Sequence, residues 1–432
     1  MDTIRKENAE LRAKVWGRKR KKPPEQPGVE PKKRGAPKGH EGWFRAKPEH
    51  IDETIQVTLD RCSECGSKDI VRCKEVEEHL QEDIVMPAVK VTLYQRYHYK
   101  CRRCQKVVRG KGADELPGSY IGPKAKALAT WLKYCIKISD RDLQRLFAKL
   151  FNLKIVVGSV FGFKNQMRRA CLGVYQEIRQ KVKRSRSIHG DETGWRIDGD
   201  NAWLWGFVNK FVALCHIDRS RGRKVLQDIL GNIYPGILIA DFLAVYNKLP
   251  ARAKQRCLVH LLRELKKILT SVDLEAGVRR YCERLKDLLQ RALALREDQR
   301  KKRCSRKSFL KRRKALEREL QDFTIANPAL PTVQRLAKRI TRHKDELFTF
   351  LHHPSIDPDN NRAERHLRPN VLLRKLTFGN RSESGVLNHN VLMSVLQTAK
   401  LHKQDGWEIL HRIMTLPSEQ RTLKIVTGAR AP

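Results

Sequence analysis

Three carboxylates stand at places in the sequence where folding could bring them together: Asp191, Asp241 and Glu364. Asp191 ends a strand predicted at residues 187–191, and Asp241 lies near the end of the apolar run at residues 236–242. If these strands are adjacent and parallel, both carboxylates emerge at one edge of the sheet. Two Mg²⁺ ions about 3.5–4 Å apart, held by such oxygens, can activate the attacking oxygen of a phosphodiester and stabilise the leaving one. The plainer alternative is that these are three solvated acids among 48.

The third carboxylate is predicted on a helix within residues 355–370. Asp357 is expected to cap this helix, and Pro369 is expected to end it. Glu364 and Arg368 are four residues apart and therefore share one helix face. The helix thus offers a polar stripe centred on a glutamate, and it must pack close to the predicted sheet for the three carboxylates to meet.

The elements that must position these residues follow from short strand-like segments that are separated by turn residues. Short strands are predicted at residues 187–191, 202–208 and 211–217, and their tight connections require an antiparallel meander. A helix is predicted at residues 222–230, before the apolar run at residues 236–242. A continuous apolar run between helices is typical of a strand buried on both faces and parallel to its neighbours. The fold class predicted is therefore multidomain α/β with a mixed sheet.

Two cysteine pairs have the spacing of metal ligands: Cys62 with Cys65, and Cys101 with Cys104. Two residues between ligands let a tight turn direct both sulfurs at one ion, so we expect a structural Zn²⁺ in a small β module at residues 51–115. Four thiolates leave no open position for a substrate. The plain expectation for most of the other cysteines is burial as small apolar groups.

A helix-turn-helix arrangement is predicted within residues 138–169. Asp140 is expected to cap its first helix, and the second helix would offer Lys164, Arg168 and Arg169 to DNA. An ordinary helical hairpin is the alternative, and it is the commoner arrangement in proteins.

The charge balance indicates an anionic partner. The chain has 432 residues, with 90 Lys and Arg against 48 Asp and Glu, a formal net charge of +42. An excess of Lys and Arg of this size commonly neutralises the phosphates of a nucleic acid, so DNA or RNA is the expected partner. No apolar run is long enough to span a membrane, and we expect no secretory signal at the start. A short helix at residues 2–16 precedes a basic arm at residues 17–50, which cannot form a core and is expected to be a DNA-binding arm or a solvated linker.

Several sequence runs resemble those of the transposases of insertion-sequence family 66. They are GDETGWRIDGDNAWLWGFV, GILIADFLAVYNKL, CLVHLLREL and NNRAERHLRP. The resemblance implies an RNase H-like core of the DDE type that uses two Mg²⁺ or Mn²⁺ ions, with Asp191, Asp241 and Glu364 as the catalytic triad. It also marks Cys257 and His260.

The C-x-x-H pair of Cys257 and His260 is expected to close a fifth strand at residues 254–259. His260 would then lie near the catalytic edge and bind phosphate or orient a carboxylate; the alternative is a packed histidine at a strand end. Arg365 and Arg368 could neutralise phosphate.

The resemblance completes the predicted organisation, an RNase H-like mixed sheet with helices on both faces. The boundaries predicted are a helix and basic arm at 1–50, the zinc module at 51–115, a helical region at 116–184, the core at 185–270 and 346–415, an all-helical insertion at 271–345, and a tail at 416–432.

The function that the resemblance implies is transposition. Implied partners are the element's ends and target DNA, a second copy of the chain or a larger assembly on DNA, and accessory proteins of the same element, in a bacterial cytoplasm. Two alternatives stay open: a catalytically silent DNA-binding protein, and a metal-dependent nuclease that joins no strands.

Overall fold

The computed structural model describes residues 50–51, 54, 56, 66–68, 89–109, 112, 114–116, 118–271, 274–325 and 331–428. The chain divides into two compact units, Met1–Glu82 and Asp83–Pro432. The few described residues of the first unit form no helix or strand. The helix predicted at residues 2–16, almost all of the basic arm, and Cys62 and Cys65 lie outside the described residues. Within the described residues, no helix is both long and apolar enough to cross a membrane.

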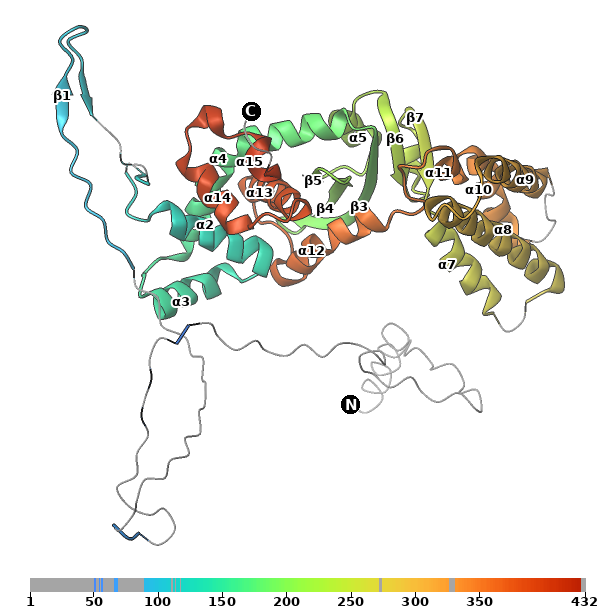
Figure 1. Ribbon diagram of the computed structural model, residues 1–432, viewed down its shortest axis with the longest axis horizontal. Helices are drawn as coiled ribbons and strands as arrows, with labels where there is room; N and C mark the ends of the chain where they lie inside the picture. The colour runs from blue at the N-terminus through green and yellow to red at the C-terminus, as the bar shows by residue number, and fades with distance from the viewer. Residues whose placement is uncertain are drawn as a thin grey trace, which may run out of the picture. The chain divides into compact units, whose positions relative to one another are not determined.

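The second unit is built around a five-stranded mixed sheet (Figure 1). Its strands are β3 (Ser187–Ile197), β4 (Asp200–Val208), β5 (Ala213–Asp218), β6 (Tyr234–Ala240) and β7 (Ala251–Arg256). The strand order is β5-β4-β3-β6-β7; β3, β4 and β5 are antiparallel, whereas β3, β6 and β7 run parallel. The antiparallel meander and the parallel pairing of the two acid-bearing strands are therefore confirmed. A separate hairpin pairs β1 (His98–Lys100) with β2 (Val107–Arg109).

Helices surround this sheet and continue the chain on either side of it. They are α2 (Pro123–Trp131), the π-helical segment η1 (Leu132–Ile136), α3 (Asp140–Phe151), α4 (Val157–Lys183), α5 (Arg223–Leu230), α6 (Ala244–Asn247), α7 (Leu258–Leu269), α8 (Ala276–Arg300), α9 (Arg306–Ile325), α10 (Pro331–Leu347), α11 (Thr349–His352), α12 (Asn361–Thr377), α13 (Glu383–Leu401), α14 (Gly406–Thr415), the 3₁₀ turn η2 (Ser418–Gln420) and α15 (Leu423–Thr427).

Alternate residues of the strands face two different helical layers, as a pleated sheet requires. On β6, Leu238 and Ala240 join the core that α4, α5 and α13 help to build. Ile237 and Ile239 join a second core with α7 and the helices that follow it. On β4, Leu204 packs in a cluster that includes Leu367 of α12. With helices on both faces, this mixed α/β fold is consistent with an RNase H-like core.

Helix α13 closes the β5 edge of the sheet through hydrogen bonds. The backbone N–H groups of Ala213, Cys215 and Ile217 donate to Thr398 Oγ1, Ser394 Oγ and Asn390 Oδ1, at 3.1, 2.9 and 2.9 Å. Four residues of helix rise about 6.0 Å, and two residues of strand about 6.7 Å, so a polar residue every fourth position of α13 meets every second N–H of β5. The edge therefore offers few free donors to another strand.

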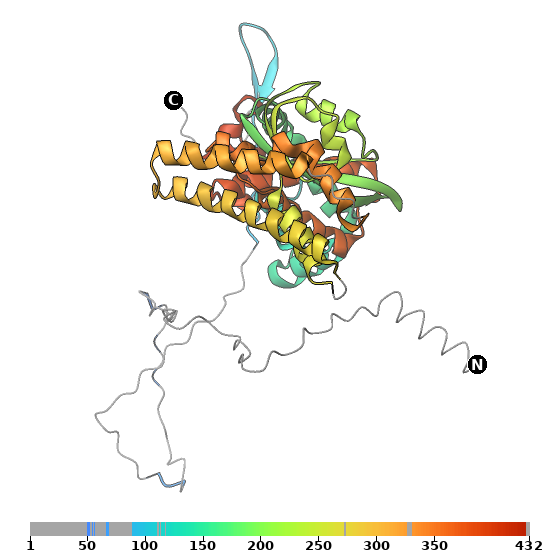
Figure 2. The ribbon, with the colours of Figure 1, turned by 90° about the vertical axis from the view of Figure 1, so that its right-hand side faces the viewer.

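The helical insertion extends the second core, which it shares with β6, beyond β7. Helices α7, α8, α9 and α10 bury an apolar cluster that includes Leu261, Leu285, Leu316 and Ile340. Figure 2 shows the long helices of this insertion lying side by side. The basic runs of the insertion form several surface ion pairs, such as Arg312 with Asp298 at 2.8 Å.

Predicted strand boundaries were wrong where tertiary pairing extended or ended the strands, and the segment predicted as a tail contains helical elements. The strand expected at residues 187–191 continues as β3 to Ile197, since His189 to Ile197 all pair with β4. The fifth strand, expected at residues 254–259, ends at Arg256, and Cys257 becomes the N-cap of α7. The expected tail forms η2 and α15, which buries Val426.

Candidate active site

The parallel pair β3 and β6 places two of the carboxylates side by side. His189 on β3 is in register with Ile239 on β6, and continuing that register by two residues sets Asp191 opposite Asp241. Asp241 follows the last residue of β6, and its Oδ1 accepts the Leu243 N–H at 2.9 Å. Asp191 lies inside β3 rather than at its end, which corrects the prediction. It still occupies the edge position, because β6 stops beside it.

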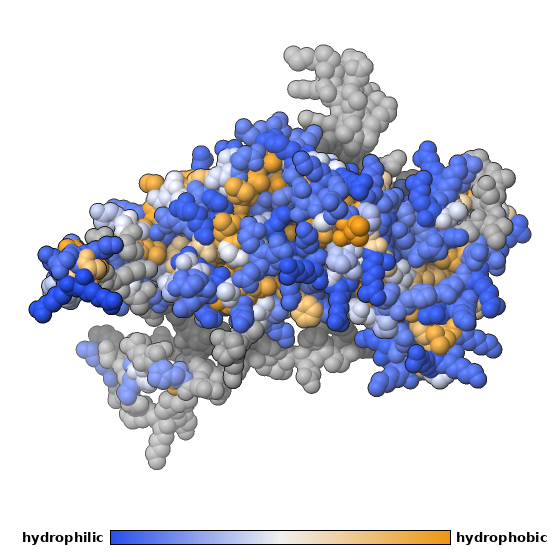
Figure 3. All heavy atoms as spheres, turned by 90° about the horizontal axis from the view of Figure 1, so that it is seen from above, coloured by the Kyte–Doolittle hydropathy of each residue, from blue (hydrophilic) through white to orange (hydrophobic). Residues whose placement is uncertain are grey.

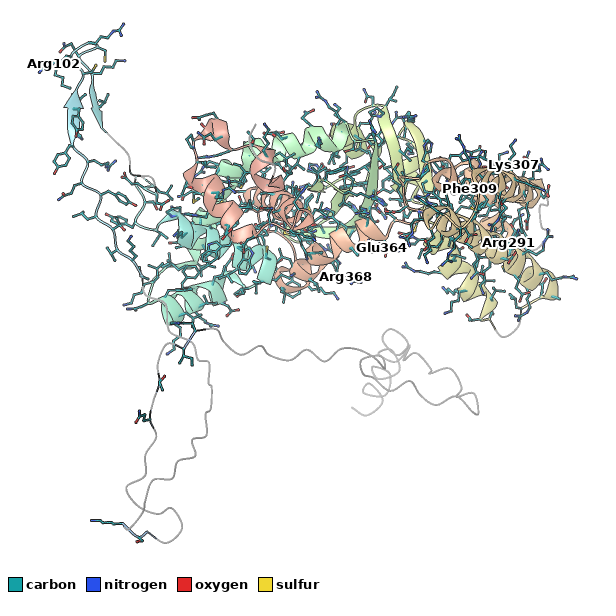
Figure 4. All side chains as sticks on the ribbon, in the orientation of Figure 1. Arg102, Arg291, Lys307, Phe309, Glu364 and Arg368 are labelled. Carbon is teal, nitrogen blue, oxygen red and sulfur yellow. The ribbon has the colours of Figure 1, made fainter. Side chains whose placement is uncertain are left out.

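The third carboxylate arrives on α12. Glu364 lies in the first turn of this helix, and its N–H donates to the N-cap carbonyl of Asn360 at 3.2 Å. In Figure 4, Glu364 and Arg368 both lie on this helix. Asp357 does not cap the helix as predicted; its carboxylate lies 3.4 Å from His189 Nε2. Pro369 does not end it either.

The residues after Pro369 stay helical because they are held by the sheet. Leu373 is buried in the main core, and Arg374 donates to the Gly194 carbonyl of β3. This packing offsets the hydrogen bond that a proline removes from a helix interior.

Asn360 ties the start of α12 to both β3 and α7. Its buried Nδ2 donates to the Gly190 carbonyl at 2.9 Å, and its backbone N–H donates to Cys257 Sγ at 3.2 Å. The N–H of Leu258, the first residue of α7, donates to the Pro358 carbonyl at 3.1 Å. The starts of α7 and α12 are therefore fixed against each other next to Asp191. Sequence reasoning assigned no role to Asn360.

A glycine on β4 lets α12 come close to the sheet at this point. Gly206 is directly opposite Asp191 in the β3–β4 register. A Cβ built on Gly206 would lie only 2.7 Å from Leu367 Cδ2 and 2.9 Å from His366 Cδ2. Because nothing but hydrogen fits there, α12 packs against the strand one turn after Glu364.

Burial and the charges of neighbouring acids act on the Asp191 carboxyl group. Burial is the largest cause that raises the pKa of Asp191, and the negative charges of Glu192, Asp241 and Glu364 raise it further. The Glu192 N–H, which donates to Asp191 Oδ1 at 2.9 Å, lowers it. The resulting pKa is about 7. A carboxyl group whose pKa is raised by burial and by neighbouring acids is typical of a functional site.

Glu192 is a fourth acid at this edge, but it is already paired. Its Oε2 accepts from the buried Tyr246 hydroxyl at 2.9 Å, and its Oε1 lies 2.7 Å from Arg221 Nη2. Tyr246 is on α6, just after Asp241, so this pair holds the segment after β6 against β3. Glu192 therefore supports the site rather than facing it.

Two basic residues of α7 face Glu364. His260 Nε2 is 3.7 Å and Arg263 Nη1 is 3.5 Å from Glu364 Oε1. His260 thus lies beside Glu364, in the first turn of a helix and not at a strand end as predicted. Arg263 was missed; it follows His260 by three residues and so shares its helix face.

The donor chemistry at this edge suits a divalent metal. Carboxylate oxygens are the ligands that Mg²⁺ prefers, and the buried Glu364 Oε1 accepts no hydrogen bond. Among the described residues, no three His, Cys, Asp or Glu side chains are grouped closely enough to hold one ion as they stand. The side chains of this edge would therefore have to turn toward each other when a metal binds.

The residues proposed for DNA contact fall into two groups. Arg365, Arg368 and Arg169 are exposed. Lys164 is buried and paired with Asp140 at 2.7 Å, and Arg168 Nε donates to Asn388 Oδ1 at 3.0 Å. Contrary to the prediction, Lys164 is therefore not available for DNA contact.

Helix α4, which carries Lys164, is a core helix for most of its length, with Met167, Cys171 and Val174 buried. The cap of α3 is Ser139, whose hydroxyl accepts the Asp142 N–H, and not Asp140 as predicted.

The β1–β2 hairpin presents half of the predicted zinc site. Cys101 and Cys104 flank its turn, and the Cys101 thiol has its pKa lowered chiefly by a hydrogen bond from the Cys104 backbone. Both are free thiols. The other two predicted ligands, Cys62 and Cys65, lie outside the described residues.

Comparison with known proteins bears on this geometry. No curated protein matches the chain. A family model described as "Transposase IS66 family" matches residues 118–387, a span that includes β3, β6, α7 and the Glu364 helix. Membership of this family implies a transposase that binds DNA and uses divalent metal ions. Since the match covers more than half of the 432 residues, the chain belongs to the IS66 transposase family.

Proposed function

We propose that this protein cuts and joins DNA strands as the transposase of an insertion sequence, with Asp191, Asp241 and Glu364 as the catalytic carboxylates. Support for the proposal comes from their placement near one edge of the sheet: Asp191 lies on β3, Asp241 follows the adjacent parallel strand β6, and the charge of Glu364 contributes to the raised pKa of Asp191. Hydrolysis of one strand would free a 3′-hydroxyl, and the same site would direct that hydroxyl at a phosphodiester of the target DNA.

The chain's own residues would prepare the site for this reaction. Two divalent cations, Mg²⁺ or Mn²⁺, held by the three carboxylates, would supply Lewis acidity and an activated oxygen nucleophile. Asn360 fixes the position of the Glu364 helix through β3. His260 would orient Glu364 or contact phosphate. The exposed Arg365 and Arg368 would hold phosphates of the bound strand.

The amino-terminal part is proposed to recognise DNA through a zinc module. The ligands would be Cys62, Cys65, Cys101 and Cys104. Support comes from the two C-x-x-C spacings and from the backbone hydrogen bond to the Cys101 thiol. The metal content of the purified protein tests this directly: zinc should be lost in Cys101→Ser and kept in Cys304→Ser. Equal zinc in both would contradict the proposed ligand.

The proposed partners are the ends of the element, the target DNA, a second copy of the chain and accessory proteins of the same element. Joining requires two DNA ends to be held together, so we expect a dimer or larger assembly on DNA.

The central experiment measures nicking and joining of DNA that carries the element's own ends, in Mg²⁺ or Mn²⁺. Asp191→Asn, Asp241→Asn and Glu364→Gln should each abolish both steps while leaving the thermal unfolding of the protein cooperative. Asp228→Asn is the matched control, since Asp228 is an exposed acid on α5, and it should keep full activity.

The alternatives predict different results in the same assay. A nuclease would nick DNA without joining the cut 3′ end to a second duplex. A catalytically silent DNA-binding protein would show neither step, with or without the substitutions. Activity that survives in all three carboxylate variants would refute the assignment of the site.

A further inference from the structure

A groove lined by basic residues lies at the end of α12 that is far from Glu364. It has a volume of about 1040 Å³ and is lined by the β3–β4 hairpin and by the residues that end and follow α12. We call it the hairpin groove. Its lining includes Arg196, Arg374, Lys375 and Arg381 against one acid, Asp198. Such a charge balance favours an anionic occupant.

An aromatic side chain projects from the lining of this groove into solvent. Phe378 is 81% exposed, and its backbone is left-handed with φ 58°. For an aromatic residue this conformation is uncommon and costs free energy, so it persists only where its surroundings enforce it. An exposed ring held in this way has no role in the core.

The surroundings do enforce the position of Phe378. Asn380 N–H donates to the Arg196 carbonyl at 2.9 Å, and Asp198 N–H donates to the Asn380 carbonyl at 2.8 Å. The Trp195 indole donates to Asn380 Oδ1 at 2.9 Å. These hydrogen bonds attach the segment after α12 to the β3–β4 hairpin, and they fix the backbone that carries Phe378.

A stripe of exposed residues connects this groove to the catalytic edge. Arg365, Arg368, Leu372 and Lys375 are all exposed on α12 and recur at helical spacing. From Glu364 to the end of α12 the helix rises about 20 Å, which equals about six nucleotides of a DNA strand at 3.4 Å each. The space-filling view of Figure 3 shows a largely hydrophilic face broken by smaller apolar areas.

We propose that the hairpin groove binds the DNA strand that runs along α12, and that Phe378 stacks on an unpaired base about six nucleotides from the cut. The inference rests on the proposed function for the location of the cut. Stacking on an aromatic ring between phosphate-binding cations is how proteins hold unpaired bases without reading sequence. Lys375 and Arg381 would take the flanking phosphates.

The test measures DNA binding by the Asp191→Asn protein without added Mg²⁺ or Mn²⁺, so its result does not depend on catalysis. The probe is a duplex with a short single-stranded gap, compared with the same duplex without a gap. Phe378→Ala should weaken binding to gapped DNA about 5- to 100-fold and leave intact duplex nearly unaffected. Phe378→Trp should restore it. Phe211→Ala is the matched control, because Phe211 is 59% exposed at the other end of β4.

Salt dependence separates stacking from charge. Lys375→Ala and Arg381→Ala should each reduce the slope of log affinity against log salt by about 0.7, whereas Phe378→Ala should leave that slope unchanged. A fluorescent adenine analogue, moved stepwise along the gap, should report stacking at one position in wild type and none in Phe378→Ala. The proposal is overturned if Phe378→Ala binds gapped DNA like wild type. It is also overturned if the groove variants weaken self-association instead of DNA binding. If the protein nicks and joins DNA but Phe378→Ala binds gapped DNA like wild type, the catalytic proposal stands and only the stacking proposal fails.

Discussion

Replacing Gly206 by alanine tests whether the close approach of α12 to β4 positions Glu364. The added methyl group would lie 2.7 Å from Leu367 Cδ2 and 2.9 Å from His366 Cδ2. Carbon atoms in contact prefer about 3.5–4.0 Å, so α12 must retreat by roughly 1 Å. Leu367 and His366 are both buried and have little room to turn aside.

The expected cost has two parts. Overpacking of this kind destabilises a protein by about 1–3 kcal/mol. A displacement of roughly 1 Å at a catalytic group can slow a reaction about 100-fold, because Glu364 lies less than one turn before Leu367 on the same helix. We therefore expect Gly206→Ala to lower the midpoint of thermal unfolding by a few degrees and to lower the rate of DNA nicking by one to two orders of magnitude.

The assay pairs thermal unfolding with single-turnover nicking of end DNA. Gly162→Ala in α4 is the control, since a Cβ there meets nothing within 4 Å and alanine is the better helix former by about 1 kcal/mol. It should unfold at the same or a higher temperature and keep full activity. Unchanged stability of Gly206→Ala would refute the close packing. Lower stability with full nicking activity would refute the link between this packing and Glu364.

Three further predictions follow from the same structure. Because the pKa of Asp191 is raised from 3.8 to about 7, the folded protein loses stability as the pH rises from the lower to the higher value. In EDTA, the stability of Asp191→Asn relative to wild type should therefore increase between these pH values and stay at that level at pH 8. An equal difference at pH 4 and pH 8 would contradict this. Asn360→Ala, which leaves the Gly190 carbonyl without its partner, should cost about 1–3 kcal/mol in urea unfolding and reduce nicking. Ser394→Ala should lower the free energy of unfolding by about the same amount, because the Cys215 N–H loses its acceptor. The nicking rate per folded molecule should stay unchanged.

Local sequence determined the elements that carry the site. The turn residues between Asp198 and Asn201 and the short strand-like segments on either side predicted the antiparallel meander, which the structure confirms. The apolar run before Asp241 predicted a strand buried on both faces, and β6 is such a strand. These predictions succeeded because continuous apolar runs and turn chemistry depend on residues close in the chain.

Tertiary structure alone decided where the elements begin and end, and which side chains remain available. Pro369 lies inside a helix because β3 and the core hold the turns that follow it. Lys164, basic and on a predicted recognition helix, is instead buried against Asp140. Asn360 is nearly inaccessible and joins residues about 170 and 100 positions away. None of these contacts has a signal in local spacing, because each depends on the free energy of packing distant segments together.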